Sequence, residues 1–332
     1  MGTVKANDLY VNAFTFVTLL SFSFTVRLSG FDADMGNYEQ YLSYNSFSIY
    51  YLKEPIYWLG SRVLYDLTDS AEFVFIFYDI IFFILIIVVR TKLQLPKYFP
   101  FLLVLFFPTV LGMQNVFRQF IASGFLLLLF SQVIASQKLS LRCMTFLFAG
   151  LSHNVSFLFL PLMFLNVKNR KVPPLFLASS LAILALLPIA AGSKSNSVTG
   201  DVPAYIYVLI FSLMIMGYAL IFKCKFKVRP PIYTQFLYLF LFCYVLLIEG
   251  MLLLGSAQSK RLGMFALFLC IIPLTMSVEI RFKQKILIRI LFIVILTAPT
   301  LLFKNALSLL QTTEESLKIE ATARSLSHHG DH

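Results

Sequence analysis

Long runs of apolar residues, separated by short polar stretches, recur along the whole chain. Each run is near the length of about 20 residues that a helix needs to cross a bilayer. Because backbone polar groups cannot face lipid unpaired, runs of this length predict helices, even where Phe, Ile and Val are dense. The predicted spans are Leu9–Val26, Ala71–Val89, Phe117–Ala135, Pro174–Ala191, Ala204–Phe222, Ile232–Leu254, Leu262–Val278 and Ile286–Phe303.

The composition agrees with a membrane protein. Of 332 residues, 59% are hydrophobic and 13% are charged, and the mean hydropathy is +0.82. A soluble globular domain has a very different balance, so we exclude that class. We expect an all-α polytopic integral membrane protein with about 9–11 transmembrane or re-entrant helices. Residues 1–310 would form one membrane domain, followed by a polar C-terminal tail at 311–332.

The basic residues indicate how the chain lies in the membrane. The net charge is +11, but more than half of the 27 Lys and Arg residues cluster between apolar runs, which argues against nucleic-acid binding. By the positive-inside rule these clusters are cytoplasmic, whereas the acidic segment 29–70 lies outside. The clusters are Arg90–Lys97, Lys138–Arg142, Lys168–Lys171, Lys223–Arg229 and Arg281–Arg289.

If all five clusters are cytoplasmic, two apolar stretches cannot be simple spans. Pro55–Leu67 is too short to cross and predicts an interfacial or re-entrant helix, with Tyr57, Trp58 and Tyr65 suited to the interface. Cys143–Leu165 is flanked by basic clusters and divides at Ser152-His153-Asn154. We interpret it as a re-entrant helical hairpin; the alternative is one long span that places Lys168 outside.

The chain carries few residues suited to metal binding. Cys143, Cys224, Cys243 and Cys270 lack CxxC spacing, and three of the four histidines lie in the C-terminal tail. We therefore expect no metal and no cofactor, and His153 is the one histidine of interest.

Polar residues gather at the predicted outer ends of the helices. Charged groups at membrane depth are costly and usually line a functional cavity. The set comprises Asp32, Asp34, Tyr38, Glu54, Arg62, Arg118, Gln119, His153, Glu249 and Arg261.

Arg118 and His153 carry the sharpest hypotheses. An arginine at a junction between two spans suits a diphosphate, because its planar donors bind phosphate bidentately, although it could instead snorkel to the interface. His153 at a hairpin tip could act as a general base or bind a sugar hydroxyl or phosphate; a packing histidine is the alternative.

The acidic residues are more ambiguous. Asp32 and Asp34 could recognise a sugar or act as a base, or could lie in a solvated loop or cap a helix. Glu54 precedes Pro55 as a helix start, so capping alone could explain it. Arg261 could be a second anion contact or an anchor, and Asp79 and Glu249 are expected to pair with neighbouring helices.

The order of several short motifs resembles that of a known family. They are Gly30-Phe31-Asp32 with Asp34 and Tyr38, Glu54-Pro55-Ile56-Tyr57, Arg118-Gln119 with Ala122, Ser152-His153-Asn154, and Arg261. From about Leu9 to Leu310 the chain resembles the EpsG family of bacterial polysaccharide polymerases, which are Wzy-type proteins of O-antigen, capsule and exopolysaccharide pathways.

This resemblance implies a GT-C-like glycosyltransferase in the bacterial cytoplasmic membrane, with its active site toward the periplasm. It would move a growing glycan from undecaprenyl diphosphate to the non-reducing end of a new undecaprenyl-diphosphate-linked repeat unit. A chain-length regulator and a flippase of the same pathway would be further partners. We expect Arg118, His153, Asp32 and Glu54 to be catalytic, and the substrate-binding residues to be Asp34, Tyr38, Arg62, Gln119, Asn154 and Arg261.

Three alternatives remain at this stage. A flippase for lipid-linked sugars also needs a polar cavity, but its polar residues usually spread through the bilayer depth. A lipid-linked glycan ligase is the closest enzyme alternative. A membrane O-acyltransferase would also use a histidine within the membrane.

Overall fold

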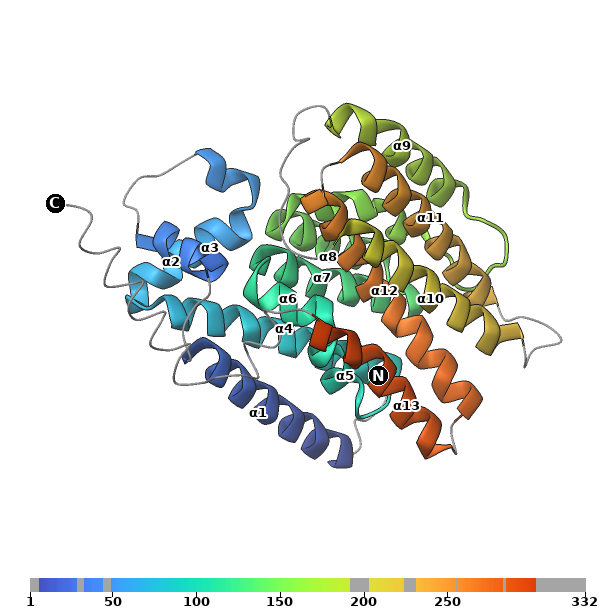
Figure 1. Ribbon diagram of the computed structural model, residues 1–332, viewed down its shortest axis with the longest axis horizontal. Helices are drawn as coiled ribbons and strands as arrows, with labels where there is room; N and C mark the ends of the chain where they lie inside the picture. The colour runs from blue at the N-terminus through green and yellow to red at the C-terminus, as the bar shows by residue number, and fades with distance from the viewer. Residues whose placement is uncertain are drawn as a thin grey trace.

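The computed structural model describes residues 6–28, 33–43, 49–191, 203–223, 231–254, 256–282 and 285–302. This described part contains helices and their connections and no β-strand (Figure 1). Within it, six helices are long and apolar enough to cross a membrane, which confirms the all-α polytopic class. They are α1 (Ala6–Leu28), α4 (Ala71–Leu93), α7 (Phe117–Ile134), α10 (Ala204–Lys223), α11 (Pro231–Leu253) and α12 (Ser256–Phe282).

The other apolar segments form shorter helices. Each of the eight predicted apolar runs is helical where the structure describes it, apart from the end residues Ala135 and Leu254. The shorter helices are α8 (Leu139–Ser152), the 3₁₀ helix η2 (Asn154–Phe164), α9 (Pro174–Ala191), α13 (Ile286–Thr297) and the 3₁₀ helix η3 (Ala298–Leu302).

α7 and α12 are the most enclosed spans of the bundle. α7 packs against α4, α8 and α12, and α12 also packs against α10 and α11. The α4–α7 contact is close because Gly124 has no side chain where the Phe82 ring lies, so the two backbones can approach. The rings of Phe82 and Phe120 add a contact with centroids 4.0 Å apart.

A broken helical segment lies between α4 and α7, and the apolar runs did not predict it. It consists of α5 (Phe99–Leu105) and α6 (Phe107–Gln114), which are separated at Phe106 by extended backbone with ψ of 130°. Pro108 stands in the first turn of α6, where its missing N–H costs no helical hydrogen bond. The Thr109 hydroxyl donates to the Leu103 carbonyl across the break.

The predicted outer segment contains more structure than we expected. The predicted interfacial helix is α3 (Pro55–Thr68), preceded by α2 (Ala33–Ser43) and the 3₁₀ helix η1 (Ile49–Lys53). The expectation that Tyr57 and Trp58 face the membrane interface is wrong. They are 0% and 7% exposed, because they pack against each other and against Tyr38 and Tyr51.

α8 and η2 fold back on each other as an antiparallel hairpin. At its base, Arg142 Nη1 donates to the Met163 carbonyl oxygen over 3.1 Å, and further along, the Phe146 and Phe157 ring centroids lie 5.7 Å apart. The helix breaks at His153, whose backbone is extended with φ of −155° and ψ of 118°. His153 is therefore the tip of the hairpin. That the hairpin enters the membrane from the cytoplasm stays a prediction.

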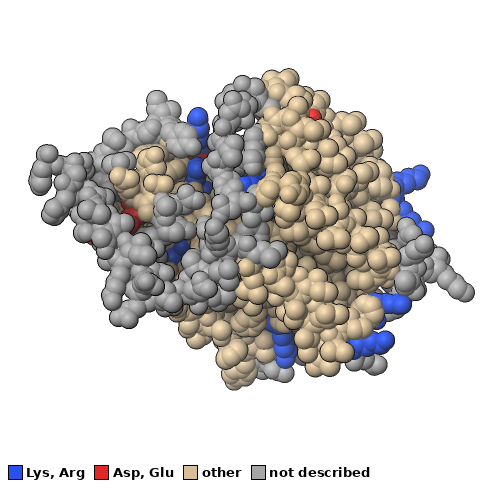
Figure 2. All heavy atoms as spheres, viewed as in Figure 1, with Lys and Arg blue, Asp and Glu red and all other residues tan. Residues whose placement is uncertain are grey.

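Basic residues gather at one end of the bundle, which we call the basic end. Helix ends at or next to the basic clusters contact one another there, as shown by the contacts of Arg90 with Asp8, of Tyr98 with Glu279 and of Gln235 with the Asn169 carbonyl. Figure 2 shows Lys and Arg atoms along the right and lower edges of a surface that is mostly uncharged there, with further basic and a few acidic atoms toward the left and the top. Residues 224–229 of the fourth cluster and residues 283–284 of the fifth lie outside the described part. That the basic end faces the cytoplasm stays a prediction from the basic loops.

Candidate active site

The carboxylate of Glu54 lies at the centre of a buried polar cluster at the end of the bundle opposite the basic end. Glu54 is 3% exposed and immediately precedes α3, but its side chain makes no capping hydrogen bond. Instead, Arg118 Nη1 donates to Oε2, while His153 Nδ1 lies 2.7 Å from Oε1 and the Asn154 amide donates to Oε1 over 3.1 Å. Capping therefore does not explain Glu54, which joins α3, α7 and the hairpin tip.

The surroundings of Glu54 keep its carboxylate charged. Burial alone would raise its pKa, but the hydrogen bond and charge of His153, the charge of Arg118 and the Asn154 amide lower the pKa to about 2. An ionised carboxylate only accepts hydrogen bonds, so Nδ1 of His153 is the donor. This leaves Nε2 as the ring atom that can accept a proton, and Nε2 is buried with no hydrogen-bond partner in the described part of the chain.

Arg118 stands in the first turn of α7 and turns inward. Its side chain is 15% exposed, and its guanidinium lies 5.1 Å from the ring centre of Trp58 and 5.8 Å from that of Tyr38. Its Nε lies 3.5 Å from the Tyr38 hydroxyl. Cation–π contacts of this kind fix a guanidinium against an aromatic surface. The alternative of an arginine that snorkels to the interface does not fit this position.

α12 forms another wall of the cluster. Gln119 Nε2 donates to the Arg261 carbonyl oxygen over 2.7 Å, which ties the first turn of α7 to α12. The Phe265 ring stacks on the His153 imidazole with centroids 6.3 Å apart. The charges of Arg118 and Arg261 both act on His153, so two cations lie within electrostatic range of its imidazole.

A buried ion pair lies next to the start of α7 and joins α1 to α4. Arg27 of α1 binds both oxygens of Asp79 of α4 at 2.9 Å and donates to the Met113 carbonyl oxygen at 2.8 Å. Its guanidinium also lies 4.8 Å from the ring centre of Phe117, the residue before Arg118. The prediction that Asp79 pairs with a neighbouring helix is confirmed.

The structure brings together most, but not all, of the predicted site residues. Asp32 and the side chain of Asp34 lie outside the described residues. The ion pair found for Arg62 is with Asp66 at 3.7 Å within α3, so a role in phosphate binding stays a prediction. Glu249 was expected to pair with a neighbouring helix, but no partner for it is found in the described part. The cluster contains Tyr38, Glu54, Arg118, Gln119, His153, Asn154 and Arg261.

Sequence reasoning missed two residues that contact the cluster and two that precede Arg118 in the chain. Trp58 and Phe265 flank Arg118 and His153, and the apolar pattern alone did not distinguish them from lipid-facing aromatics. Gln114 and Asn115 end α6 just before Arg118, and each has a buried side-chain oxygen with no partner among the described residues. Polar residues directly before a candidate arginine are the signal that could have found them, since buried polar atoms without partners need an explanation.

Among the described residues, no three His, Cys, Asp or Glu side chains come together as metal ligands. The chemistry that the cluster itself offers is anion binding by arginine and proton transfer by an imidazole that a carboxylate orients.

Comparison with protein families identifies the chain. The model of the EpsG family matches residues 10–312 of the 332. The chain belongs to the EpsG family. Membership supports a membrane protein of the polysaccharide-polymerase type, in agreement with the resemblance that the motifs carried. Comparison with curated proteins and with solved structures gave no match.

Proposed function

We propose that this EpsG-family protein is a glycosyltransferase that lengthens a polysaccharide on a membrane-bound diphosphate carrier. It would transfer the growing glycan from undecaprenyl diphosphate to the non-reducing end of a new lipid-linked repeat unit, at the periplasmic face. The observation that carries the proposal is that one buried carboxylate, Glu54, binds both Arg118 and His153.

Arg118 would stabilise the leaving diphosphate. When the bond between the sugar C1 and the diphosphate oxygen breaks, negative charge develops on the diphosphate, and donors placed there in advance lower the barrier. A guanidinium has five N–H groups, so it can bind a carboxylate and a phosphate together. Arg261, from the other wall, would add a second positive charge.

His153 would remove the proton from the acceptor hydroxyl as its oxygen attacks C1. Glu54 holds Nδ1 and leaves Nε2 to receive the proton. Glu54 itself is a poor base, because a pKa of about 2 gives it little affinity for a proton at neutral pH. Glu54 is therefore a positioning residue in this proposal. Asp32 remains a candidate for recognition of the acceptor or for a share in proton transfer.

The test is reconstitution of the full chain in vesicles with purified lipid-linked repeat units, followed by gel analysis of product length. We expect a ladder of products from the wild type and only single repeat units from Arg118→Ala. Arg170→Ala removes an exposed arginine at the basic end and should leave the ladder unchanged. Full-length glycan from Arg118→Ala would refute the role of Arg118.

The alternatives predict different outcomes in vesicles and in cells that lack the protein. A flippase would move the lipid-linked unit across the vesicle membrane without lengthening it. A ligase would pass a preformed polymer to an acceptor, and a cell that lacks it would accumulate long unattached polymer. A cell that lacks a polymerase would instead carry single repeat units.

A further inference from the structure

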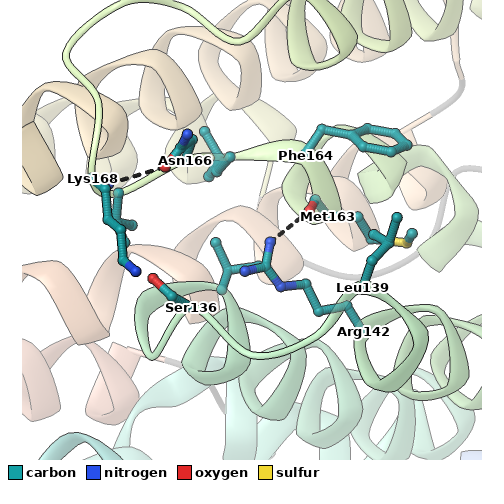
Figure 3. A pocket seen from close by; sticks show the side chains of 10 residues that line it. Ser136, Leu139, Arg142, Met163, Phe164, Asn166 and Lys168 are labelled. Carbon is teal, nitrogen blue, oxygen red and sulfur yellow. Dashed lines mark hydrogen bonds between the residues drawn. The ribbon is translucent and has the colours of Figure 1, made fainter.

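A second polar feature lies at the basic end, remote from the candidate active site. It is a hollow of about 370 Å³ where the base of the α8–η2 hairpin meets the end of α7 (Figure 3). Val133 in its wall is 15 residues from Arg118 along α7, a distance of about 22 Å at 1.5 Å per residue. The lining comprises Val133, Ser136, Leu139, Arg142 and the continuous segment from Met163 to Lys168.

The polar groups of the hollow favour an anion. Arg142 and Lys168 bring two positive charges, and none of the lining residues is acidic. Figure 3 shows the Lys168 amine directed toward Ser136, with the Arg142 guanidinium across the hollow. Arg142 Nη1 is bound to the Met163 carbonyl oxygen, but its Nε is buried with no hydrogen-bond partner in the described part. α8 begins at Leu139 in the lining, so the positive end of its helix dipole lies at the hollow.

The surface next to the hollow is apolar and exposed. Leu139, Met144 and Leu147 of α8 are each more than half exposed, which is costly in water but suits hydrocarbon chains. A ligand with an anionic head and apolar tails would therefore match both parts of this region. A free phosphate ion would match only the hollow.

We propose that this hollow binds the phosphate group of an anionic phospholipid, with the acyl chains along the exposed face of α8. Basic pockets between membrane helices are suited to such headgroups, because phosphate accepts hydrogen bonds from Arg and Lys in a partly dehydrated site. The site is separate from the proposed glycosyl transfer, so either proposal can fail without the other.

The test is native mass spectrometry of the full chain in detergent, titrated with dioleoylphosphatidylglycerol or dioleoylphosphatidylcholine. We expect tighter binding of the anionic lipid. Lys168→Gln should weaken its binding about fivefold, the effect of one basic residue at a membrane surface. Lys168 is the primary variant because no hydrogen bond of its ammonium to a described residue is found, whereas Arg142 also holds the hairpin base.

Arg170→Gln is the matched control, since it removes a nearby exposed charge outside the hollow. Equal binding of the two lipids, or equal losses in Lys168→Gln and Arg170→Gln, would overturn the proposal. A third titration uses inorganic phosphate, detected by thermal stabilisation of the protein. The assignment to a lipid would also be overturned if phosphate stabilised the wild type but not Lys168→Gln, and the protein showed no preference for phosphatidylglycerol.

Discussion

Glu54 Oε1 lies 2.7 Å from His153 Nδ1, although 99 residues separate the two positions. The contact joins the start of α3 to the single extended residue at the hairpin tip. A carboxylate in this position selects the imidazole tautomer that keeps a lone pair on Nε2 and fixes the direction of that lone pair. The two residues therefore form a base and its orienting group before any substrate arrives.

Replacement of His153 should slow glycan lengthening while the protein stays folded. We expect His153→Gln to reduce the initial rate by about 10²–10⁴, the usual contribution of a general base. The fall in rate toward acidic pH should also disappear in the variant, because the group that must lose its proton is gone. Initial rates across pH 5 to 9 with purified lipid-linked repeat units would measure both effects. A variant with the wild-type rate and pH profile would exclude His153 as the base.

Glu54 should make stability depend on pH in the acidic range. Its folded pKa of about 2 lies below the ordinary value of about 4.3, so its ionised form stabilises the fold above the ordinary pKa. That contribution should be lost as the pH falls from about 4.3 to 2. Thermal unfolding in detergent at pH 7, 4.5 and 3 would measure it.

The matched variants for this experiment are Glu54→Gln and Glu72→Gln. Glu54→Gln should lower the unfolding temperature at pH 7 and flatten its decline toward pH 3. Glu72 is partly exposed and accepts a hydrogen bond from Ser70 at the start of α4, so its replacement should keep the wild-type decline. Parallel declines in Glu54→Gln and wild type would contradict the link to this carboxylate.

Much of the fold follows from the sequence, but the pairing within the site does not. The apolar runs predicted the spans because the bilayer sets a minimum length for a crossing helix. Ser152-His153-Asn154 located the hairpin tip, since three polar residues interrupt an apolar stretch there. The partners of Glu54 could not be predicted, because tertiary packing brings α3, α7 and the hairpin together. Trp58 was wrongly assigned to the interface, since an interfacial and a buried tryptophan have the same sequence signal.

The contribution of the buried Arg27–Asp79 ion pair to stability can be tested. Asp79→Leu or Arg27→Met alone leaves a buried charge without its partner, which should destabilise the protein by about 3–5 kcal/mol. The double variant should be more stable than either single variant, because no unpaired charge remains. Unfolding in detergent for the four proteins of this cycle would measure the coupling. Additive losses would show that the two side chains do not stabilise each other.

The direction of the hairpin in the membrane can be tested at Asn166, an exposed residue in the lining of the hollow. In a variant with all four native cysteines replaced by serine, Asn166→Cys should react with a membrane-impermeant maleimide only from the cytoplasmic side. This follows from the basic residues Lys168, Arg170 and Lys171 beside it. Labelling of intact cells from the periplasmic side would defeat the predicted topology and favour one long span.

A single residue, His153, connects the end of α8 to the start of η2, so no longer loop is present that could absorb a change in chain length. Insertion of one residue in η2 before its kink at Phe159 would rotate the residues that follow by roughly 120°, since a 3₁₀ helix has three residues per turn. Phe159 would then leave its contact with Phe265, and Met163 would lose its register with Arg142. We therefore expect the fold of the hairpin to be disturbed far less by a substitution in η2 than by an insertion or deletion there.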